Sequence, residues 1–549
     1  MADIVIINPR FNTSFWGMEK CMGMLGKRAN LPVACLPLLA ALVPKHHNVT
    51  IVDENVEEID FDRLGRADMV CMTGMSIQGT RMREILEQVR HRGVLAVVGG
   101  PLATVEPEEI SDLADVVFIG EADATWPQFI REWETGCHAC RYEQHAKTDM
   151  TTLPLPRIEL LKSQHYMFGS MQISRGCPFT CEFCDIIITF GRKPRLKSNQ
   201  QVLAELDAYY REGIKIVFVV DDNLIGNKKA IKPTLREIAK WQEDHGYALT
   251  LFTEASLDLA EDEELMILMG RAGFQSVFIG IESPDEASLK ETKKYQNVRE
   301  RAGTLVERVK RIQNNGLDVW CGMIVGFDND KPAAFEVLPG FLSEARIANA
   351  LIGLLHAIPT TPLYNRLKAE GRLNDAAGNE AYGTNVIPLG MSPQNMRDGL
   401  VNVTERCYSA DAYFQRLDAL FIDGGFEFAA HQLGYWRSHR LAWVKSCFEN
   451  YIMFTVLAGR LVHRVEDRDL ACRYRSQLFR AFRARMFEPQ LLFTYAVKTA
   501  MHYHYAAIAK SLSDSLGGPV PESVRSFSRS RSRDTPGNSS TIQIPAGNG

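Results

Sequence analysis

The segment 174–184 carries three cysteines, Cys177, Cys181 and Cys184, with the spacing Cys-x3-Cys-x2-Cys. Thiolates at this density suit a soft metal ion or an iron–sulfur cluster. A 4Fe-4S cluster has four irons, so three thiolates leave one iron open to chelate a substrate or a cofactor. The spacing therefore predicts a metal cluster with one open position.

Two simpler interpretations apply to the same cysteines: buried structural thiols, or a zinc site without its fourth ligand. Zinc sites usually combine one Cys-x2-Cys pair with a second pair downstream, and no such pair follows closely here. The nearest candidate, Cys137 and Cys140, lies upstream in a predicted loop, and a second cluster would need more ligands than that pair offers. An apolar strand at 171–174 leads into the motif, and this context favours the cluster.

The motif resembles the signature of the radical S-adenosylmethionine (SAM) superfamily. The resemblance implies that the three cysteines ligate a 4Fe-4S cluster and are essential for catalysis. It also implies that the open iron holds the amino and carboxylate groups of SAM, and that Phe183 packs against the adenine. Six strand–helix units between residues 171 and 360 are similar to the partial (β/α)6 barrel of this superfamily, which places its chemistry at the carboxyl ends of the strands.

Polar groups and glycines end the later strands of this predicted barrel. By the same resemblance, the candidate SAM-binding residues beside Phe183 are Asp222, Asn223, Glu254, Ser256, Glu282, Ile324 and Gly326. Asp222 and Asn223 stand where Gly-Gly-Glu is commoner, so they are predicted to hold the amino nitrogen. The basic loop 192–197 either neutralises cluster or cofactor charge or is simply solvated.

Residues 1–140 alternate short β-branched runs with helix-like segments. Apolar runs at 4–7, 49–52, 69–73, 95–98 and 116–119 predict buried parallel strands. The pattern predicts a doubly wound α/β domain that binds its ligand at the carboxyl ends of the strands. The segment 8–30, rich in aromatic and turn-forming residues, follows the first strand on that side, where it either covers the ligand or forms a surface loop.

Turn residues follow the third, fourth and fifth of these strands, and their succession resembles the cobalamin-binding domain that precedes many radical SAM domains. The resemblance implies cobalamin contacts at Ser76, Gly99, Gly100, Pro101, Gly120 and Glu121. Residues 53–58 read Asp-Glu-Asn-Val-Glu-Glu and lack the Asp-x-His-x-x-Gly motif of domains with an axial histidine, so a bound cobalt would have no protein imidazole ligand. The alternative is a flavodoxin-like domain that has lost ligand binding.

The composition is ordinary for a soluble globular protein, with 46% hydrophobic and 23% charged residues among 549. A net charge of −5 gives no indication of nucleic-acid binding. Twelve scattered cysteines fit a reducing compartment rather than a disulfide framework. The N-terminus lacks the features of a signal peptide, and no apolar run approaches the ~20 residues that span a bilayer. We therefore expect a cytoplasmic location, with a peripheral site at the inner membrane face as an option.

The remaining segments complete the predicted organisation. Residues 141–170 form a stiff linker around Leu-Pro-Leu-Pro at 153–156, residues 361–515 an all-helical domain, and residues 516–549 a disordered tail rich in Ser, Arg, Pro and Gly. From Arg437 to Glu488, eleven Lys and Arg outnumber five Asp and Glu, a net charge of +6, and apolar residues are interleaved. This pattern predicts either basic, apolar-faced helices at a membrane surface or a helical lid with a solvated basic face.

Over residues 1–500 the chain resembles the cobalamin-dependent radical SAM methylases, and among them most closely the hopanoid C-2 methylase family. The features are Asn-Pro-Arg-Phe at 8–11, the segments 26–32 and 52–55, and the helical C-terminal part. The resemblance implies three cofactors (a 4Fe-4S cluster, SAM and cobalamin), a reducing electron donor and a hydrophobic polycyclic lipid substrate that enters between the two α/β domains. Hopanoid C-2 has no acidic proton, so acid–base catalysis would not suffice; a radical derived from SAM removes its hydrogen and methylcobalamin supplies the methyl group.

Three alternatives stay open at this point. The same machinery could methylate or cyclise another substrate. The chain could instead be a cobalamin-binding sensor with a degenerate barrel, against which the intact cysteine triad argues. It could also be a corrinoid or lipid carrier without catalysis, in which case replacing Cys177 would leave its function untouched.

Overall fold

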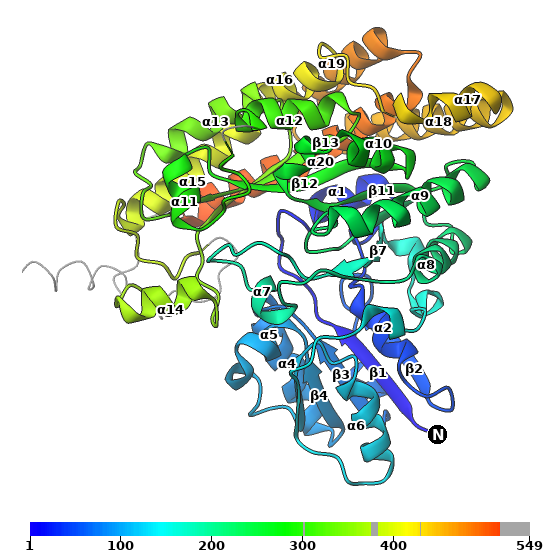
Figure 1. Cartoon of the computed structure of the whole chain (residues 1–549), viewed down its shortest axis with the longest axis vertical. Helices are drawn as coiled ribbons and strands as arrows, with labels where there is room; N and C mark the ends of the chain where they lie inside the picture. The colour runs from blue at the N-terminus through cyan, green and yellow to red at the C-terminus, as the bar shows by residue number, and fades with distance from the viewer. Residues whose placement is uncertain (300–301, 375–382, 429, 517–549) are drawn as a thin grey trace, which may run out of the picture.

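Two six-stranded parallel sheets organise the computed structural model, which describes residues 1–299, 302–374, 383–428 and 430–516. The N-terminal sheet lies at one end of the molecule, the second sheet lies in the middle, and a layer of long helices covers the other end (Figure 1). This α/β architecture, with a separate helical region, is the predicted fold class. Residues 517–549 of the predicted disordered tail lie outside the described part of the chain.

The N-terminal sheet has the strand order β2-β1-β3-β4-β5-β6, with every neighbouring pair parallel. Its strands are β1 Asp3–Asn8, β2 Asn48–Asp53, β3 Met69–Thr73, β4 Leu95–Gly99, β5 Val116–Gly120 and β6 Arg141–Gln144. The helices are α1 Glu19–Leu25, α2 Cys35–Ala41, α3 Phe61–Leu64, α4 Gly79–His91, α5 Pro101–Val105 and α6 Thr125–Glu134. The five predicted strands are confirmed, and the chain order reverses between β1 and β3, which opens a crevice at the carboxyl ends of those strands.

The second sheet is an open partial barrel with the order β14-β13-β12-β11-β10-β7. Its strands are β7 Gly169–Met171, β10 Ile216–Val219, β11 Thr250–Ala255, β12 Phe274–Glu282, β13 Asp318–Val325 and β14 Ala350–Leu354. The helices of this part are α7 Ile186–Thr189, α8 Asn199–Arg211, α9 Lys228–Asp244, α10 Glu263–Arg271, α11 Glu286–Glu291, α12 Leu305–Asn314, α13 Ala334–Glu344 and α14 Pro362–Ala369. The short strand β8 Ser174–Arg175 pairs antiparallel with β9 Arg195–Leu196, so the residues that enter the cysteine motif have already left the main sheet.

The C-terminal layer consists of helices. These are α15 Pro393–Tyr408, α16 Ala410–Phe421, α17 Leu433–Ser438, α18 Arg440–Arg464, α19 Arg468–Arg485 and α20 Pro489–Leu516. Helix α20 packs against α15, α16, α18 and α19 and is the central element of this layer. In the described part of the chain, no helix combines the length and the apolarity needed to cross a membrane.

The segment 8–30 links all three parts of the molecule. Trp16 packs against Phe278 and Phe218 of the barrel sheet, at centroid distances of 4.8 and 6.4 Å. Phe15 stacks on Tyr505 of α20 at 4.6 Å, and α1 lies beside α20 (Figure 1). The aromatic side chains of this segment therefore pin it between the barrel and the C-terminal helices. That the segment also covers a ligand stays a prediction.

Candidate active site

The three cysteines lie in the loop between β8 and α7, at the carboxyl end of the barrel sheet. Cys181 is buried, and Cys177 and Cys184 are half-buried. Burial, followed by the charges of Asp185, Cys181 and Cys177, raises the pKa of Cys184 to about 12. A buried thiol of this kind needs a metal to become a thiolate, so the donor set fits a thiolate-bound cluster.

The loop is held in place by two neighbouring aspartates that follow β10. Asp221 accepts hydrogen bonds from the backbone N–H groups of Ile173 and Ser174, at 2.7 and 2.8 Å. Asp222, predicted to bind SAM, accepts from the N–H of Gly176 at 2.7 Å. Gly176 has φ +95°, and a Cβ there would lie 2.9 Å from the carbonyl oxygen of Gly191, so only glycine fits directly before the first cysteine.

Two side-chain amides donate hydrogen bonds to the cysteine sulfurs. Asn223 Nδ2 lies 3.8 Å from Cys177 Sγ, and Gln296 Nε2 lies 3.5 Å from Cys181 Sγ. Asn223 also bonds Ser256 Oγ at 3.1 Å, which joins two predicted SAM-binding residues. Hydrogen bonds to ligand sulfurs are one way in which proteins set the reduction potential of an iron–sulfur cluster. The SAM contacts of Asn223 and Ser256 stay predictions.

A buried ion pair lies beside the cysteines. Lys294 Nζ and Glu282 Oε1 are 2.5 Å apart, and Glu282 has the unusual backbone angle φ +67° at the end of β12. Burial alone would lower the pKa of Lys294, but Glu282 and the thiols of Cys181 and Cys184 raise it. Lys294 is therefore placed to offset negative charge on a thiolate-bound cluster. Its partner Glu282 was predicted to bind SAM, and that contact stays a prediction.

Phe183 and Ile324 come together although they are far apart in sequence. Both pack against one apolar cluster that contains Phe327 and Leu355. Gly326 has φ +118°, and a Cβ there would lie 2.5 Å from Cε of Met396, so the backbone itself requires glycine at this position. The structure thus brings Phe183 and Ile324, two predicted SAM-binding residues, to one apolar cluster, and Gly326 adjoins Phe327 of that cluster. The contact of these residues with SAM stays a prediction.

Three carboxyl groups gather at the carboxyl ends of β10 and β11. Burial raises the pKa of Glu254 to about 8, that of Asp221 to about 7 and that of Asp222 to about 6. Charge repulsion within the group adds to the shift, and Lys294 opposes it only in part at Glu254. None of these carboxyl groups has an ion-pair partner among the described residues, and a cation beside them would favour their ionised form. The site therefore suits a positively charged ligand, and SAM carries both an ammonium and a sulfonium group.

Glu254→Gln should change how stability depends on pH. In the folded protein Glu254 keeps its proton up to pH of about 8, whereas unfolded glutamate ionises near 4.5. Folding therefore takes up a proton in this window, and stability falls as pH rises from 5 to 8. Glutamine does not titrate, so the variant does not lose this stability as pH rises. The difference in Tm, variant minus wild type, measured without cofactors, should therefore be roughly 2–4 °C or more larger at pH 8 than at pH 5.

Glu264→Gln is the control for this measurement. The hydrogen bond to Lys232 lowers the pKa of the exposed Glu264, so its charge does not change between pH 5 and 8. The Tm of this variant should differ from wild type equally at both pH values. If Glu254→Gln also showed the same Tm difference from wild type at pH 5 and at pH 8, the proton assigned to Glu254 would be contradicted.

The predicted cobalamin edge of the N-terminal sheet faces the loop that carries the cysteines. A cleft of about 280 Å³ opens between the end of β5, at Gly120, and the short helix α7 that follows Cys184. Thr104, Gln144 and Lys147 give it polar walls, which suit the amide-bearing edge of a corrin. Cobalamin is larger than this cleft, so the cleft would hold only part of it.

The other predicted cobalamin residues lie along the same edge. Ser76 Oγ donates a hydrogen bond to Glu106 at 3.1 Å, and Pro101 begins α5 directly after Gly99 and Gly100. At Gly100 a Cβ would lie 2.2 Å from Oγ1 of Thr73, so the turn itself requires glycine. The cobalamin contacts of these residues stay predictions.

Glu121, another predicted cobalamin residue, joins the two α/β domains. Its carboxylate pairs with Arg195 at 2.8 Å and with Arg175 at 3.1 Å, and Arg175 also pairs with Asp123. Burial alone would raise the pKa of Glu121, but the two arginines lower it. The basic loop is therefore not merely solvated at Arg195, because that side chain helps to hold the N-terminal domain against the cysteine loop.

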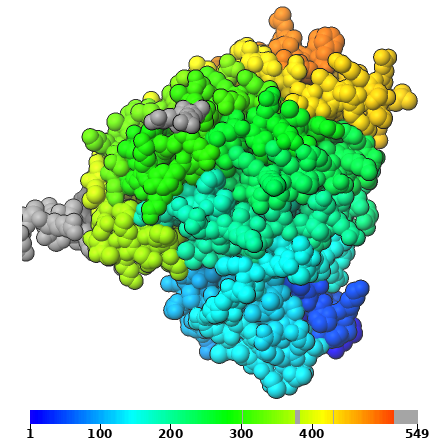
Figure 2. Space-filling view, viewed as in Figure 1, coloured from blue at the N-terminus to red at the C-terminus, as the bar shows by residue number. Residues whose placement is uncertain are grey.

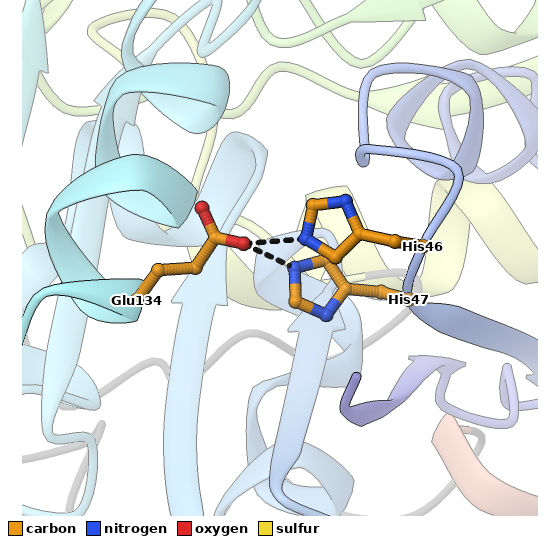
Figure 3. Close-up of side chains that lie close together, drawn as sticks. All are labelled: His46, His47 and Glu134. Carbon is orange, nitrogen blue, oxygen red and sulfur yellow. Dashed lines mark hydrogen bonds and ion pairs between the residues drawn. The ribbon is translucent and has the colours of Figure 1, made fainter.

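A second group of possible metal ligands lies at the opposite edge of the N-terminal sheet. His46 and His47 both direct Nε2 at Oε1 of Glu134, at 2.6 and 3.0 Å (Figure 3). The backbone N–H of Ala2 donates to Nδ1 of His47 at 3.2 Å, so the proton of this ring lies on Nε2 and is donated to Glu134. Both nitrogens of His47 are thus engaged, and the group works as a hydrogen-bonded clamp between the α2–β2 loop and α6.

Several functional groups could not be found from sequence. Lys294 and Gln296 lie in a loop after α11 with no motif spacing, and they reach the cysteines only because the barrel closes around them. Asp221 and Arg175 adjoin predicted residues, but their local sequence gives no sign of their roles. Asp221 supports the cysteine loop, and Arg175 connects the two α/β domains.

Three family models match the chain. The Radical SAM superfamily model matches residues 171–338, the B12 binding domain model residues 31–130, and a domain of unknown function (DUF4070) residues 361–516. An uncharacterized methyltransferase of Synechocystis sp. is 41% identical over 77% of this chain and 79% of its own length. The hopanoid C-2 methylase of Rhodopseudomonas palustris is 33% identical over 76% of this chain and 78% of its own length.

Solved structures share the fold at low sequence identity. One is the cobalamin-dependent SAM radical enzyme OxsB with aqua-cobalamin and SAM bound, which is 12% identical to this chain. The alignment covers 96% of this chain and 83% of OxsB, with a TM-score of 0.59. At this identity the likeness supports the arrangement of the domains.

Proposed function

Because this chain belongs to the cobalamin-dependent radical SAM methyltransferases, we propose that it methylates C-2 of the hopanoid A ring. Its cofactors are a 4Fe-4S cluster, SAM and cobalamin, which together supply a radical that removes a hydrogen atom and a methyl group to replace it. The reaction needs an external reductant. The protein's own part is to bind, orient and shield these groups.

The cluster would be held by Cys177, Cys181 and Cys184. Asn223 and Gln296 would donate hydrogen bonds to the ligand sulfurs, and the buried Lys294 would offset the negative charge of the cluster. A fixed cation and fixed donors in a buried site need no reorganisation when the charge of the cluster changes. We therefore assign these three polar residues to the tuning of the cluster.

SAM would lie across the carboxyl ends of the barrel strands. The carboxyl groups of Glu254 and Asp222 suit its ammonium group, and the apolar cluster beside Phe183 and Ile324 suits its adenine. Cobalamin would enter from the other side, at the cleft between Gly120 and α7. On this proposal both cofactors would lie at the boundary of the two α/β domains, where the substrate carbon would also have to lie.

The observation that carries the hopanoid assignment is the similarity to the hopanoid C-2 methylase, which extends over most of both chains. A saturated ring carbon has neither an acidic proton nor a nucleophilic lone pair. Methylation of such a carbon is the reaction that this set of cofactors serves. A hopanoid resides in a bilayer, so the proposal includes a peripheral contact between the protein and a membrane.

The lipid profile of a host that makes hopanoids without 2-methyl groups tests the proposal. Expression of this chain with cobalamin supplied should produce a new methyl group on the A-ring fragment at C-2, detected by mass spectrometry. The same host with Cys177→Ala should show none. An unchanged profile from cluster-loaded protein that still cleaves SAM would discard the hopanoid assignment and leave the enzyme class standing.

A further inference from the structure

Helix α18 has two apolar faces, and only one of them is packed against the protein. Phe454, Leu457 and Leu461 recur at helical spacing and are buried. Leu441, Val444, Phe448, Ile452 and Val456 also recur every three or four residues, and their exposed fractions are 88, 56, 67, 47 and 47%. At 100° per residue the two stripes lie on opposite sides of the helix. The second stripe therefore has no cover in the described part of the chain.

Helix α19 extends this apolar surface. Phe479 and Phe482 share one face of α19 and are exposed, as are Met486 and Phe487 directly after the helix. Phe482 stacks on Phe454 of α18 at 6.2 Å, which places the two helices side by side. Of the twenty exposed large apolar side chains in the described part of the chain, twelve lie between 433 and 487. A concentration of this kind marks an interaction surface.

Basic residues accompany the apolar ones on the same helices. Arg475 and Arg483 lie four residues on either side of Phe479, and Lys445 lies within the exposed stripe of α18. Arg437, Arg440 and Arg475 are exposed and form no ion pair with a carboxylate in the described ranges. The segment from Arg437 to Glu488 carries +6 in a chain whose net charge is −5. The surface thus combines large apolar side chains with unneutralised positive charge.

We propose that α17, α18 and α19 dock the enzyme onto the surface of an anionic phospholipid bilayer. Apolar side chains would enter the region between headgroups and acyl chains, while arginines and lysines would contact lipid phosphates. Charge decides against two other occupants. A second copy would bring the same basic, apolar surface, with its exposed Arg437, Arg440 and Arg475, against that of the first, and the chain's own residues 517–549 add four arginines against two acidic residues.

The docking surface is separate from the site of chemistry. Figure 2 shows the segment of α17–α19 at the end of the molecule opposite the N-terminal domain. In Figure 1, α7, which follows the cysteines, lies between the two α/β domains, far from α17 and α18. Docking would hold the enzyme at the membrane without taking part in catalysis. The inference deepens the membrane contact included in the proposed function, and its evidence is the surface of α17–α19 rather than the hopanoid assignment. It gives a role to part of the segment matched by the domain of unknown function.

Co-sedimentation of the full chain with vesicles tests the proposal. We expect binding to vesicles of phosphatidylglycerol and phosphatidylcholine, and at least tenfold weaker binding to phosphatidylcholine alone. The triple variant Leu441→Glu/Phe448→Glu/Ile452→Glu should bind the anionic vesicles at least tenfold more weakly than wild type. The matched control Leu155→Glu/Val337→Glu/Leu389→Glu changes three exposed apolar residues elsewhere and should bind as wild type does.

The outcomes separate this proposal from the hopanoid assignment. The docking variant should cleave SAM in solution at the wild-type rate when loaded with its cluster, because none of its three positions lies at the active site. Equal binding by wild type and the docking variant, or no vesicle binding by wild type, would overturn the proposal. A dimer that the docking variant abolishes, without vesicle binding by wild type, would overturn it in favour of a second copy.

Discussion

Cys177→Ala should abolish both cluster assembly and SAM cleavage, with a loss of activity of about a thousandfold or more. The thiol lies in the loop between β8 and α7 and interacts electrostatically with Cys181, while Asn223 donates to its sulfur. With one of three ligands gone, the cluster loses an iron–protein bond, and no neighbouring cysteine replaces it in the described structure. The measurements are iron and sulfide content and the release of 5′-deoxyadenosine by anaerobically reconstituted protein.

The double variant Cys137→Ala/Cys140→Ala is the matched control. Both thiols are exposed and lie at the N-terminal sheet, away from the cysteine loop. This variant should keep the wild-type iron content and rate of SAM cleavage. Retained SAM cleavage in Cys177→Ala would refute the assignment of the cluster, and loss of iron in the control would reveal a second iron site.

Arg175→Met should destabilise the protein by about 3–5 kcal/mol, because it leaves the buried carboxylate of Asp123 without its cation and that of Glu121 with Arg195 alone. The side chains of Arg175, Glu121 and Asp123 are exposed by only 8, 1 and 6%. Their ion pairs join the end of β5 to the residue that enters the cysteine loop. The substitution therefore weakens the contact between the two α/β domains. The free energy of unfolding in urea measures the effect.

Arg141→Met removes a comparable ion pair at the surface. Arg141 pairs with Glu143, but its side chain is 54% exposed, and solvent screens such pairs. Its loss should cost less than about 1 kcal/mol. Equal effects of the two substitutions would show that the pairing of Arg175 with Glu121 and Asp123 does not hold the domains together.

The local features of the chain could be predicted because they depend on neighbouring residues. The cysteine spacing is set within eight residues, and the strands around it are short apolar runs whose burial requires parallel pairing. Phe183 and Ile324 were predicted separately and meet in one apolar cluster. Glycines at strand ends were also visible, although at Gly100 and Gly120 the backbone itself requires them.

The features that could not be predicted depend on distant contacts. Strand β6 reads Arg-Tyr-Glu-Gln and lies in the segment predicted as a linker, and only its position at the sheet edge makes it a strand. Helix α20 is covered on several sides by neighbouring helices and buries polar as well as apolar residues, so it lacks the one-sided apolar pattern of a surface helix. Glu121 was predicted at the cobalamin edge, but its side chain is paired across the domain boundary.

The most direct test of the central claim follows the methyl group itself. The host that makes hopanoids would be fed methionine with a trideuterated methyl group while it expresses this chain and receives cobalamin. The account predicts a 2-methylhopanoid that retains all three deuteriums on the A-ring fragment, since the methyl group is transferred intact. A product with no deuterium, or one that has lost a deuterium, would contradict it. So would a methyl label that appears only on a different lipid and is absent from the same host with Cys177→Ala.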